Sequence, residues 1–386
     1  MSANRINDAV VPFKIVIPQS ELDDLQRRLD TTRWPERETV GDLSQGAQLD
    51  KVQKLVDYWR RQYDWRQLEA RLNGYPQFKT EIDGLAIHFL HIRSPHADAL
   101  PMVMTHGWPG SIVEFLDVID PLVDPSAHGG EAAQAFHLVI PSIPGFGFSD
   151  KPDAKGWNRN RIGKAWDVLM QRLGYDRYVA QGGDWGSVVT TEMGRLALDG
   201  LAAIHINLPF VAQLPFPENP TEEERIAIEQ CTLFAEDGSF YHHLQTTRPQ
   251  TIGYALADSP AGQAAWIYEK LGAWSDNLNG PEDVFSYDQM LNNIMFYWLT
   301  NSGASSARMY AEHPGLNFGA VPVDIPVAVS VFPREIYTPP RSWAEKTYSK
   351  MFYWNRPQKG GHFAAFEQPM IFVGELRAAF ASLRNA

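Results

Sequence analysis

The segment Gly182-Gly183-Asp184-Trp185-Gly186 sets an aspartate among glycines at a spacing that suits covalent chemistry. Where a strand turns sharply into a helix, the residues two positions before and after the centre must be small, because side chains there would collide with the backbone. A carboxylate presented at such a turn can attack saturated carbon and form an alkyl ester, whereas a serine would form an acyl ester. An aspartate that only caps a helix in a glycine-rich turn is the competing interpretation.

A second carboxylate and a histidine follow Asp184, each at the end of a predicted strand. Glu335 ends the segment 332–335, and His362 ends the segment 360–362. A histidine can act as a general base, and a carboxylate beside it fixes its tautomer and stabilises its charged form. A lone histidine is more often structural, but the order Asp184, Glu335, His362 is that of nucleophile, acid and base. The three placements together predict a catalytic triad.

The segment His106-Gly107-Trp108-Pro109-Gly110 follows the apolar run 102–104. In hydrolases built on a parallel sheet, this loop donates one backbone N–H to an oxyanion, and the residue after the nucleophile donates the other. The predicted oxyanion hole therefore consists of the N–H groups of Trp108 and Trp185. An ordinary turn without a catalytic role is the alternative for this segment.

The elements that must position these residues alternate between short apolar runs and helical stretches. A hairpin is predicted around Asp83-Gly84. The apolar runs 102–104, 138–140, 178–180 and 203–206 each end near a glycine turn or before a helical stretch, and strand character returns at 327–332 and 351–354. This rhythm predicts a mostly parallel, doubly wound sheet.

Between the strands the chain changes character twice. Residues 1–76 form a leader with helical spacing, and residues 209–316 carry helical signals only, including capping boxes that start at Thr221 and Ser286. We therefore predict an N-terminal meander (1–76), a core made of 77–208 and 317–386, and a helical lid (209–316).

Composition excludes several classes of protein. The formal net charge of -12 gives no electrostatic footprint for nucleic acid. The single cysteine, Cys231, rules out an internal disulfide framework and is read as a small packing residue of the core or lid. The apolar stretch near residues 10–17 is broken by Pro12 and Lys14, so neither a secretory signal nor a membrane span is expected and the cytoplasm is the default location.

With these motifs in place, the chain resembles the epoxide hydrolases of the α/β-hydrolase fold, specifically the microsomal-type branch with an N-terminal meander. The resemblance covers nearly the whole chain and is carried by residues 16–35, 106–110, 145–149, 182–186, 332–335 and 361–362. It implies an α/β fold with an inserted helical lid. It also implies that Glu335 is the acid of the triad, because the alternative family position, one strand earlier, holds Asn207, whose amide carries no charge to stabilise the histidine. The membrane anchor of the vertebrate members is missing here, so the resemblance implies a soluble protein.

The resemblance also implies two lid tyrosines. Tyr241 precedes Thr247-Arg248-Pro249, and Tyr310 follows the segment 297–300 at the spacing of the second family tyrosine. A single lid tyrosine is more often a packing residue, but two phenols can hold the epoxide oxygen while Asp184 opens the ring. The expected product is a vicinal diol, formed without metal or organic cofactor.

Aromatic residues near the motifs, among them Phe146 and Phe148, predict substrate contacts and an apolar, aryl-bearing epoxide. The expected partner is this small molecule, with no nucleic acid and no membrane anchor, and a homodimer is compatible with the sequence.

Two alternatives share the motifs. A haloalkane or haloacid dehalogenase would use the same aspartate but needs donors for a halide in place of two phenols, and Trp185 suits either reaction. A non-catalytic ligand binder on the same fold would be favoured by loss of a triad member, and none is lost. An esterase fits less well, because an aspartate would form a mixed anhydride with an acyl group.

Overall fold

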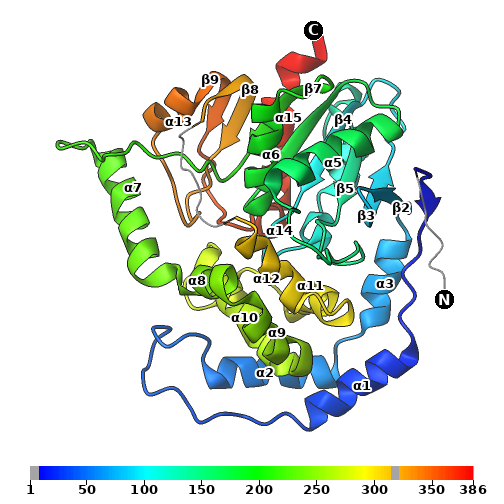
Figure 1. The fold of residues 1–386 in the computed structure, drawn as a ribbon, viewed down its shortest axis with the longest axis vertical. Helices are drawn as coiled ribbons and strands as arrows, with labels where there is room; N and C mark the ends of the chain where they lie inside the picture. The colour runs from blue at the N-terminus through cyan, green and yellow to red at the C-terminus, as the bar shows by residue number, and fades with distance from the viewer. Residues whose placement is uncertain (1–7, 314–320, 386) are drawn as a thin grey trace.

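The computed structural model describes residues 8–313 and 321–385, which form one sheet with helices on both faces and a helical layer across one end (Figure 1). Within the described chain the sheet has nine strands in the order β1-β2-β3-β5-β4-β6-β7-β8-β9. The strands are β1 Val11–Pro12, β2 Gln77–Ile82, β3 Leu85–Ile92, β4 Leu100–Thr105, β5 Phe136–Pro141, β6 Tyr178–Gly182, β7 Leu201–Ile206, β8 Val323–Ser330 and β9 Tyr348–Asn355.

The sheet is antiparallel at one side and parallel across the rest. Strands β1, β2, β3 and β5 pair antiparallel, and every pair from β5 to β9 is parallel. The predicted hairpin joins β2 to β3 through Asp83 and Gly84, whose φ angles of 52° and 85° are those of a two-residue turn with both central residues left-handed. The predicted mostly parallel, doubly wound sheet is confirmed.

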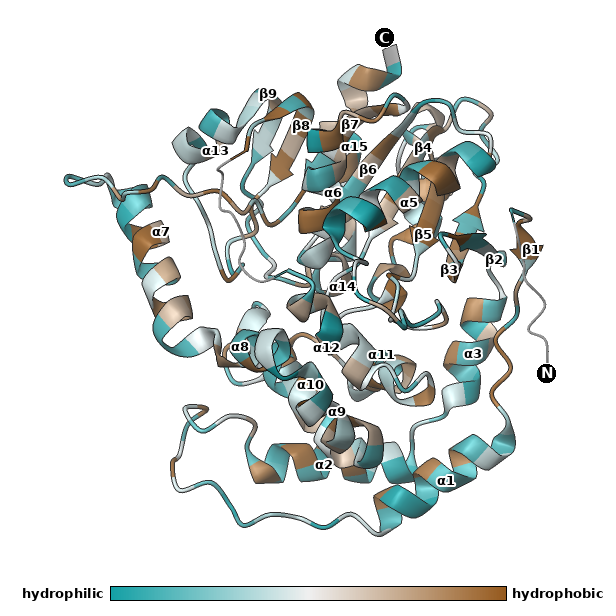
Figure 2. Ribbon diagram, in the orientation of Figure 1, coloured by the Kyte–Doolittle hydropathy of each residue, from teal (hydrophilic) through white to brown (hydrophobic). Residues whose placement is uncertain are grey.

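Helices cover both faces of the sheet because each buries one apolar side. On one face α5 (Arg159–Arg172) packs against α6 (Trp185–Leu196), which contacts β4, β6, β7 and β8. On the other, α4 (Ile119–Val123) contacts β5 and α15 (Pro369–Ala379) contacts β8. Hydrophobic residues gather on the strands, and hydrophilic residues lie on the outward sides of α1 and α5 (Figure 2).

The helices between β7 and β8 correspond to the predicted lid. Both predicted capping boxes are present, at Thr221–Glu224 and Ser286–Gln289. The predicted boundary between lid and core at 316–317 lies outside the described residues. The lid helices are α7 Glu222–Leu233, α8 Phe240–Thr247, α9 Pro249–Asp258, α10 Pro260–Trp274, α11 Tyr287–Leu299 and α12 Gly303–Ala311.

The N-terminal helices close the lid from the side away from the sheet. α1 (Gln19–Asp30) contacts α10, and α2 (Leu49–Arg61) contacts α10 and α11 (Figure 1). α2 ends before α3 (Trp65–Asn73) begins, because the Asp64 side chain accepts a hydrogen bond from the Arg66 N–H and starts a new helix. The lid is thereby held between the core and the N-terminal segment.

Two short elements complete the part of the core that supports the site. α13 (Arg341–Thr347) precedes β9, and α14 (Ala364–Glu367) follows it. Among residues 8–313 and 321–385, the structure contains no helix that is both long and apolar enough to cross a bilayer.

Candidate active site

Asp184 lies at the junction between β6 and α6, in a backbone conformation that aspartate rarely adopts. Its φ and ψ are 50° and -126°, and such strain costs about 1–3 kcal/mol. The glycines around it make the turn possible. A Cβ on Gly182 would lie 2.1 Å from the Gly186 carbonyl oxygen, and a Cβ on Gly186 would lie 1.9 Å from the Thr105 carbonyl oxygen.

His362 and Glu335 meet because the strands that precede them are neighbours. β8 and β9 pair in parallel, and a bridge between Arg334 and Gly361 continues the pairing past the strand ends. The His362 Nδ1 lies 2.6 Å from the Glu335 Oε1, and both side chains are buried. The His362 Nε2 lies 3.2 Å from the Asp184 Oδ2 without the alignment of a hydrogen bond. The three residues predicted from the sequence thus form one contiguous cluster.

The charge of His362 is set by opposing effects. Burial alone would lower its pKa, but the Glu335 and Asp184 carboxylates together raise the pKa of His362 well above its usual value. The imidazole is therefore held in its charged form while both carboxylates are charged. Loss of the Asp184 charge would remove one of the two anions and lower the pKa of His362.

Glu367, on α14, anchors the loop that carries His362, and sequence reasoning missed it. Its carboxyl accepts hydrogen bonds from the N–H groups of Gly361, Phe363 and Asp276, at 3.0, 2.9 and 2.8 Å. Burial raises the pKa of Glu367 to about 7 despite these hydrogen bonds. The carboxyl therefore ties the histidine loop to the lid residue Asp276, a contact between distant segments that no local motif indicates.

The predicted oxyanion donors lie on opposite sides of the Asp184 turn. β4 pairs with β6 so that Thr105 is opposite Gly182, which brings the loop after β4 beside Asp184. The Trp108 N–H donates to the Asp184 Oδ1 at 2.8 Å. Trp185 is the first residue of α6, so its N–H has no partner within the helix.

The two predicted phenols come from α8 and α12, which contact one another. Tyr241 and Tyr310 are both buried, with ring centroids 5.9 Å apart. Tyr241 stacks on Trp108, Tyr310 meets the edge of Trp185, and the Tyr310 hydroxyl has no hydrogen-bond partner in the described chain. Burial raises the pKa of both phenols well above the usual value, and the nearby Asp184 charge raises both further. Both phenols are therefore protonated at neutral pH.

A cavity of about 320 Å³ extends from Asp184 to the lid, and most of its wall is apolar. Asp184, Tyr241 and Tyr310 line it together. The rest of the wall is Trp185, Val188, Phe210, Gln230, Cys231, Phe234, Ala235, Ser239, His242, His243, Ile336 and Tyr337. Sequence reasoning treated Cys231 as a small packing residue, because lid helices give no periodic signal that separates a pocket wall from packing.

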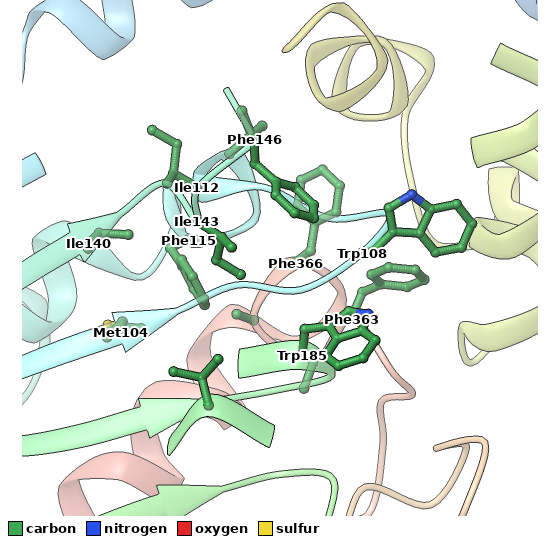
Figure 3. Close-up of a cluster of buried hydrophobic side chains, with 14 of the residues drawn as sticks. Met104, Trp108, Ile112, Phe115, Ile140, Ile143, Phe146, Trp185, Phe363 and Phe366 are labelled. Atoms are coloured by element: carbon green, nitrogen blue, oxygen red, sulfur yellow. The ribbon is translucent and has the colours of Figure 1, made fainter. Parts of the chain in front are cut away.

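Phe146 and Phe148 do not line this cavity, contrary to the sequence prediction. Phe146 is buried within the hydrophobic cluster of Figure 3, where its ring meets His106 and Tyr297. Phe148 packs against Phe13, His88 and Phe296. The turn after β5 directs both rings into the core, so they support the fold and not the substrate.

Glu114 is a further carboxyl near Asp184 that sequence reasoning missed. It belongs to the short 3-10 helix Ile112–Phe115, and burial raises its pKa to about 8. An acidic residue in an otherwise apolar segment is the available sequence signal, but only the tertiary structure brings it to the site.

Among the residues that the structure describes, no group of histidine, cysteine or acidic side chains is arranged to hold a metal ion.

Two family profiles match the chain. The profile described as epoxide hydrolase N terminus matches residues 10–115, and the profile described as alpha/beta hydrolase fold matches residues 101–230. A putative epoxide hydrolase of Stigmatella aurantiaca is 60% identical over 97% of this chain and 86% of its own. The chain belongs to the epoxide hydrolase family. Epoxide hydrolase 1 of Sus scrofa is 34% identical over 96% of this chain and 88% of its own.

Two solved structures of epoxide hydrolases match this chain over nearly its full length. The enzyme of Aspergillus niger matches with a TM-score of 0.86 and 33% identity, over 98% of this chain and 97% of its own. The juvenile hormone epoxide hydrolase of Bombyx mori matches with a TM-score of 0.89 and 28% identity, over 99% and 96%. Both matches include the N-terminal helices and the helices between β7 and β8 of this epoxide hydrolase, since they cover 98% and 99% of the chain.

Replacing Gly186 by alanine is expected to destabilise this epoxide hydrolase by about 3 kcal/mol, because the new Cβ would collide with the Thr105 carbonyl of a central strand. Thermal and urea unfolding measure the change. Gly374→Ala on α15 is the matched control, since a Cβ there meets nothing within 4 Å and should stabilise the helix by about 0.5–1 kcal/mol. Equal stability of the two variants would contradict the steric account of the turn.

Replacing Glu335 by glutamine is expected to move the pH dependence of ester hydrolysis. His362 is expected to act as a base only when neutral, so the rate should fall as the pH drops through the pKa of that histidine, which the Glu335 charge raises. Without that charge the acidic limb should shift to lower pH, while the maximal rate falls roughly 10²–10⁴-fold because the imidazole is no longer oriented. Single-turnover rates across pH measure both effects.

Glu375→Gln is the control for this experiment, because Glu375 is a buried carboxyl that bonds Ser330 and Asn355 away from both Asp184 and His362. The acidic limb of the pH–rate profile of Glu375→Gln should lie at the same pH as in the parent enzyme. An unshifted limb in Glu335→Gln would show that the Glu335 charge does not act on His362.

Proposed function

We propose that this epoxide hydrolase opens an apolar epoxide by attack of Asp184 on a ring carbon and releases a vicinal diol. One observation carries the proposal: the Asp184 carboxylate lies at the end of an apolar cavity, with the Trp108 N–H at 2.8 Å and the His362 Nε2 at 3.2 Å. A carboxylate so placed has the substrate cavity on one side and a base on the other. That arrangement suits two successive displacements.

In the first step a carboxylate oxygen of Asp184 forms a bond to one epoxide carbon. The bond between that carbon and the ring oxygen breaks, and the electron pair stays on the oxygen. Tyr241 and Tyr310 share the cavity wall with Asp184 and are protonated, so either hydroxyl can give this oxygen a proton. The products of the step are an ester on Asp184 and a hydroxyl on the neighbouring carbon.

In the second step water attacks the carboxyl carbon of Asp184. Ester formation has removed the Asp184 charge, so the pKa of His362 falls and the imidazole can accept the proton of that water. The oxyanion that forms is stabilised by the N–H groups of Trp108 and Trp185, worth about 3–4 kcal/mol for one such donor. The ester bond then breaks, and the leaving alkoxide takes up a proton to complete the diol.

The wall of the cavity supports an apolar substrate. The side chains of Phe210, Phe234 and Ile336 are apolar, and most of the wall is apolar. An uncharged epoxide with an aryl or alkyl substituent would bury that substituent against these residues, which favours binding by roughly 25 cal/mol per Å² of apolar surface removed from water. A homodimer stays a prediction from the sequence.

One turnover in water enriched in heavy oxygen, with enzyme in excess over styrene oxide, tests the covalent route. Heavy oxygen should enter the Asp184 carboxylate, because water attacks the carboxyl carbon, and the first diol should carry none. His362→Gln should still open the ring but accumulate the ester, detected as added mass on the peptide that contains Asp184.

A labelled diol in that first turnover would contradict the ester. Failure of His362→Gln to give any adduct, with ring opening abolished, would contradict the role of His362 as a base for the second step alone. Chloride release from a haloalkane without epoxide turnover would favour a dehalogenase.

Replacing either Tyr241 or Tyr310 by phenylalanine is expected to slow ester formation roughly 100-fold, because one of two donors to the leaving oxygen is lost. The double variant should be close to inactive. Stopped-flow tryptophan fluorescence measures the step, since Trp108 and Trp185 lie beside the two rings. Tyr268→Phe is the control, a buried lid phenol bonded to Glu282, and should form the ester at the parent rate. Parent rates in both single variants would remove the phenols from the mechanism.

A further inference from the structure

Asp184 borders two cavities. The larger one is lined by the two phenols, and the smaller one, of about 20 Å³, shares only Asp184 with it. His362 lines the smaller cavity and not the larger one. A buried water needs about 10–15 Å³, so the smaller cavity accommodates a single water molecule.

The wall of the small cavity contains buried polar atoms that make no hydrogen bond within the described chain. The His362 Nε2 and the Gln181 Oε1 are buried and have no hydrogen-bond partner in the described chain. The Gln181 amide is fixed by its Nε2, which donates to the Asn207 Oδ1 at 3.1 Å. An unsatisfied buried polar atom costs about 1–3 kcal/mol, and a water with two to four polar partners removes that cost.

Glu114 brings a carboxyl to the same cavity. Its side chain is partly buried and lines the cavity together with His362 and Asp184. The carboxyl passes directly beneath the turn after β4, where a Cβ on Gly110 would lie 2.8 Å from the Glu114 Oε1. Gly110 therefore leaves the space that the carboxyl occupies.

The pKa of Glu114 is set by burial and by three neighbouring groups. Burial raises the pKa of Glu114 to about 8, the His362 charge and a hydrogen bond from the Gly107 amide act against this, and the Asp184 charge adds to it. At neutral pH the carboxyl can therefore donate or accept a hydrogen bond. Ester formation on Asp184 removes the anion that faces it.

We propose that the small cavity holds the water that hydrolyses the Asp184 ester, and that Glu114 is the residue that positions it. The inference rests on the proposed function. The water oxygen forms a bond to the Asp184 Cγ and gives one proton to the His362 Nε2. The second O–H of the water donates a hydrogen bond to the Glu114 carboxyl. This hydrogen bond keeps a lone pair of the water oxygen aimed at the Asp184 Cγ. The electron pair of the broken ester bond leaves with the diol oxygen.

This placement separates the two reactants of the enzyme. The epoxide reaches Asp184 from the apolar cavity, while the water waits in the small cavity, whose wall contains the base His362. Glu114 has no contact with the substrate cavity, so its loss should affect the second step alone.

Glu114→Gln tests the proposal, because it keeps the size of the side chain and removes the carboxyl. With styrene oxide as the probe, the rate of ester formation should stay within about threefold of the parent. The rate of ester hydrolysis should fall roughly 10- to 100-fold, since a misplaced nucleophile costs that much. Steady-state kcat and KM should then fall together with kcat/KM unchanged, and the ester should accumulate on the Asp184 peptide.

Two further variants keep the test decisive. Glu282→Gln is the matched control, a partly buried glutamate in a 3-10 helix that bonds Tyr268 and lines neither cavity of Asp184, and it should leave both rates unchanged. Glu114→Asp retains a carboxyl and should recover part of the rate of ester hydrolysis. If Glu114→Gln fails to fold, the hydrolysis rate of Glu114→Asp relative to the parent tests the water site instead.

Unchanged hydrolysis in Glu114→Gln, or an equal loss in both steps and in kcat/KM, would overturn the water site. That result is distinct from failure of the proposed function, in which the parent enzyme itself would form no ester on Asp184.

Discussion

The site depends on one constraint, the strained turn that holds the Asp184 carboxylate at the end of β6. A positive φ at an aspartate is unfavourable, and it persists because Gly182 and Gly186 let the backbone of β6, α6 and β4 approach within contact distance. The approach brings the Trp108 N–H to the carboxylate. The same strain that costs stability therefore holds the Asp184 carboxylate against the Trp108 N–H.

Charge in the site is organised around that carboxylate. Three further carboxyls, from Glu335, Glu114 and Glu367, lie nearby in a largely buried region, and each is held by different partners. Glu335 faces the His362 Nδ1, Glu367 accepts three backbone N–H groups, and Glu114 lies beneath the turn after β4. Burial raises the pKa of Glu114 to about 8 and that of Glu367 to about 7. A buried cluster can hold several acidic groups only if some stay protonated or strongly bonded.

The lid contributes the phenols and closes the substrate cavity, and the N-terminal helices hold the lid. α1 and α2 contact lid helices and lie across them from the sheet. Tyr241 and Tyr310 come from α8 and α12, which contact one another directly. The His362 loop is also tied to the lid, since the His362 N–H donates to the Trp274 carbonyl. The distance between phenols and nucleophile thus depends on segments that span almost the whole chain.

Features that arise from local chemistry could be predicted from the sequence alone. The Asp83-Gly84 hairpin, the two capping boxes and the glycines around Asp184 follow from steric and hydrogen-bond rules that act over a few residues, and the chain order of Asp184, Glu335 and His362 follows from the order of the strands. Which side chains face the cavities could not be predicted in this way, because it depends on long-range packing. The tertiary structure directed Phe146 and Phe148 into the core and brought Glu114 beneath Gly110, because those contacts join segments whose relative position no periodicity encodes.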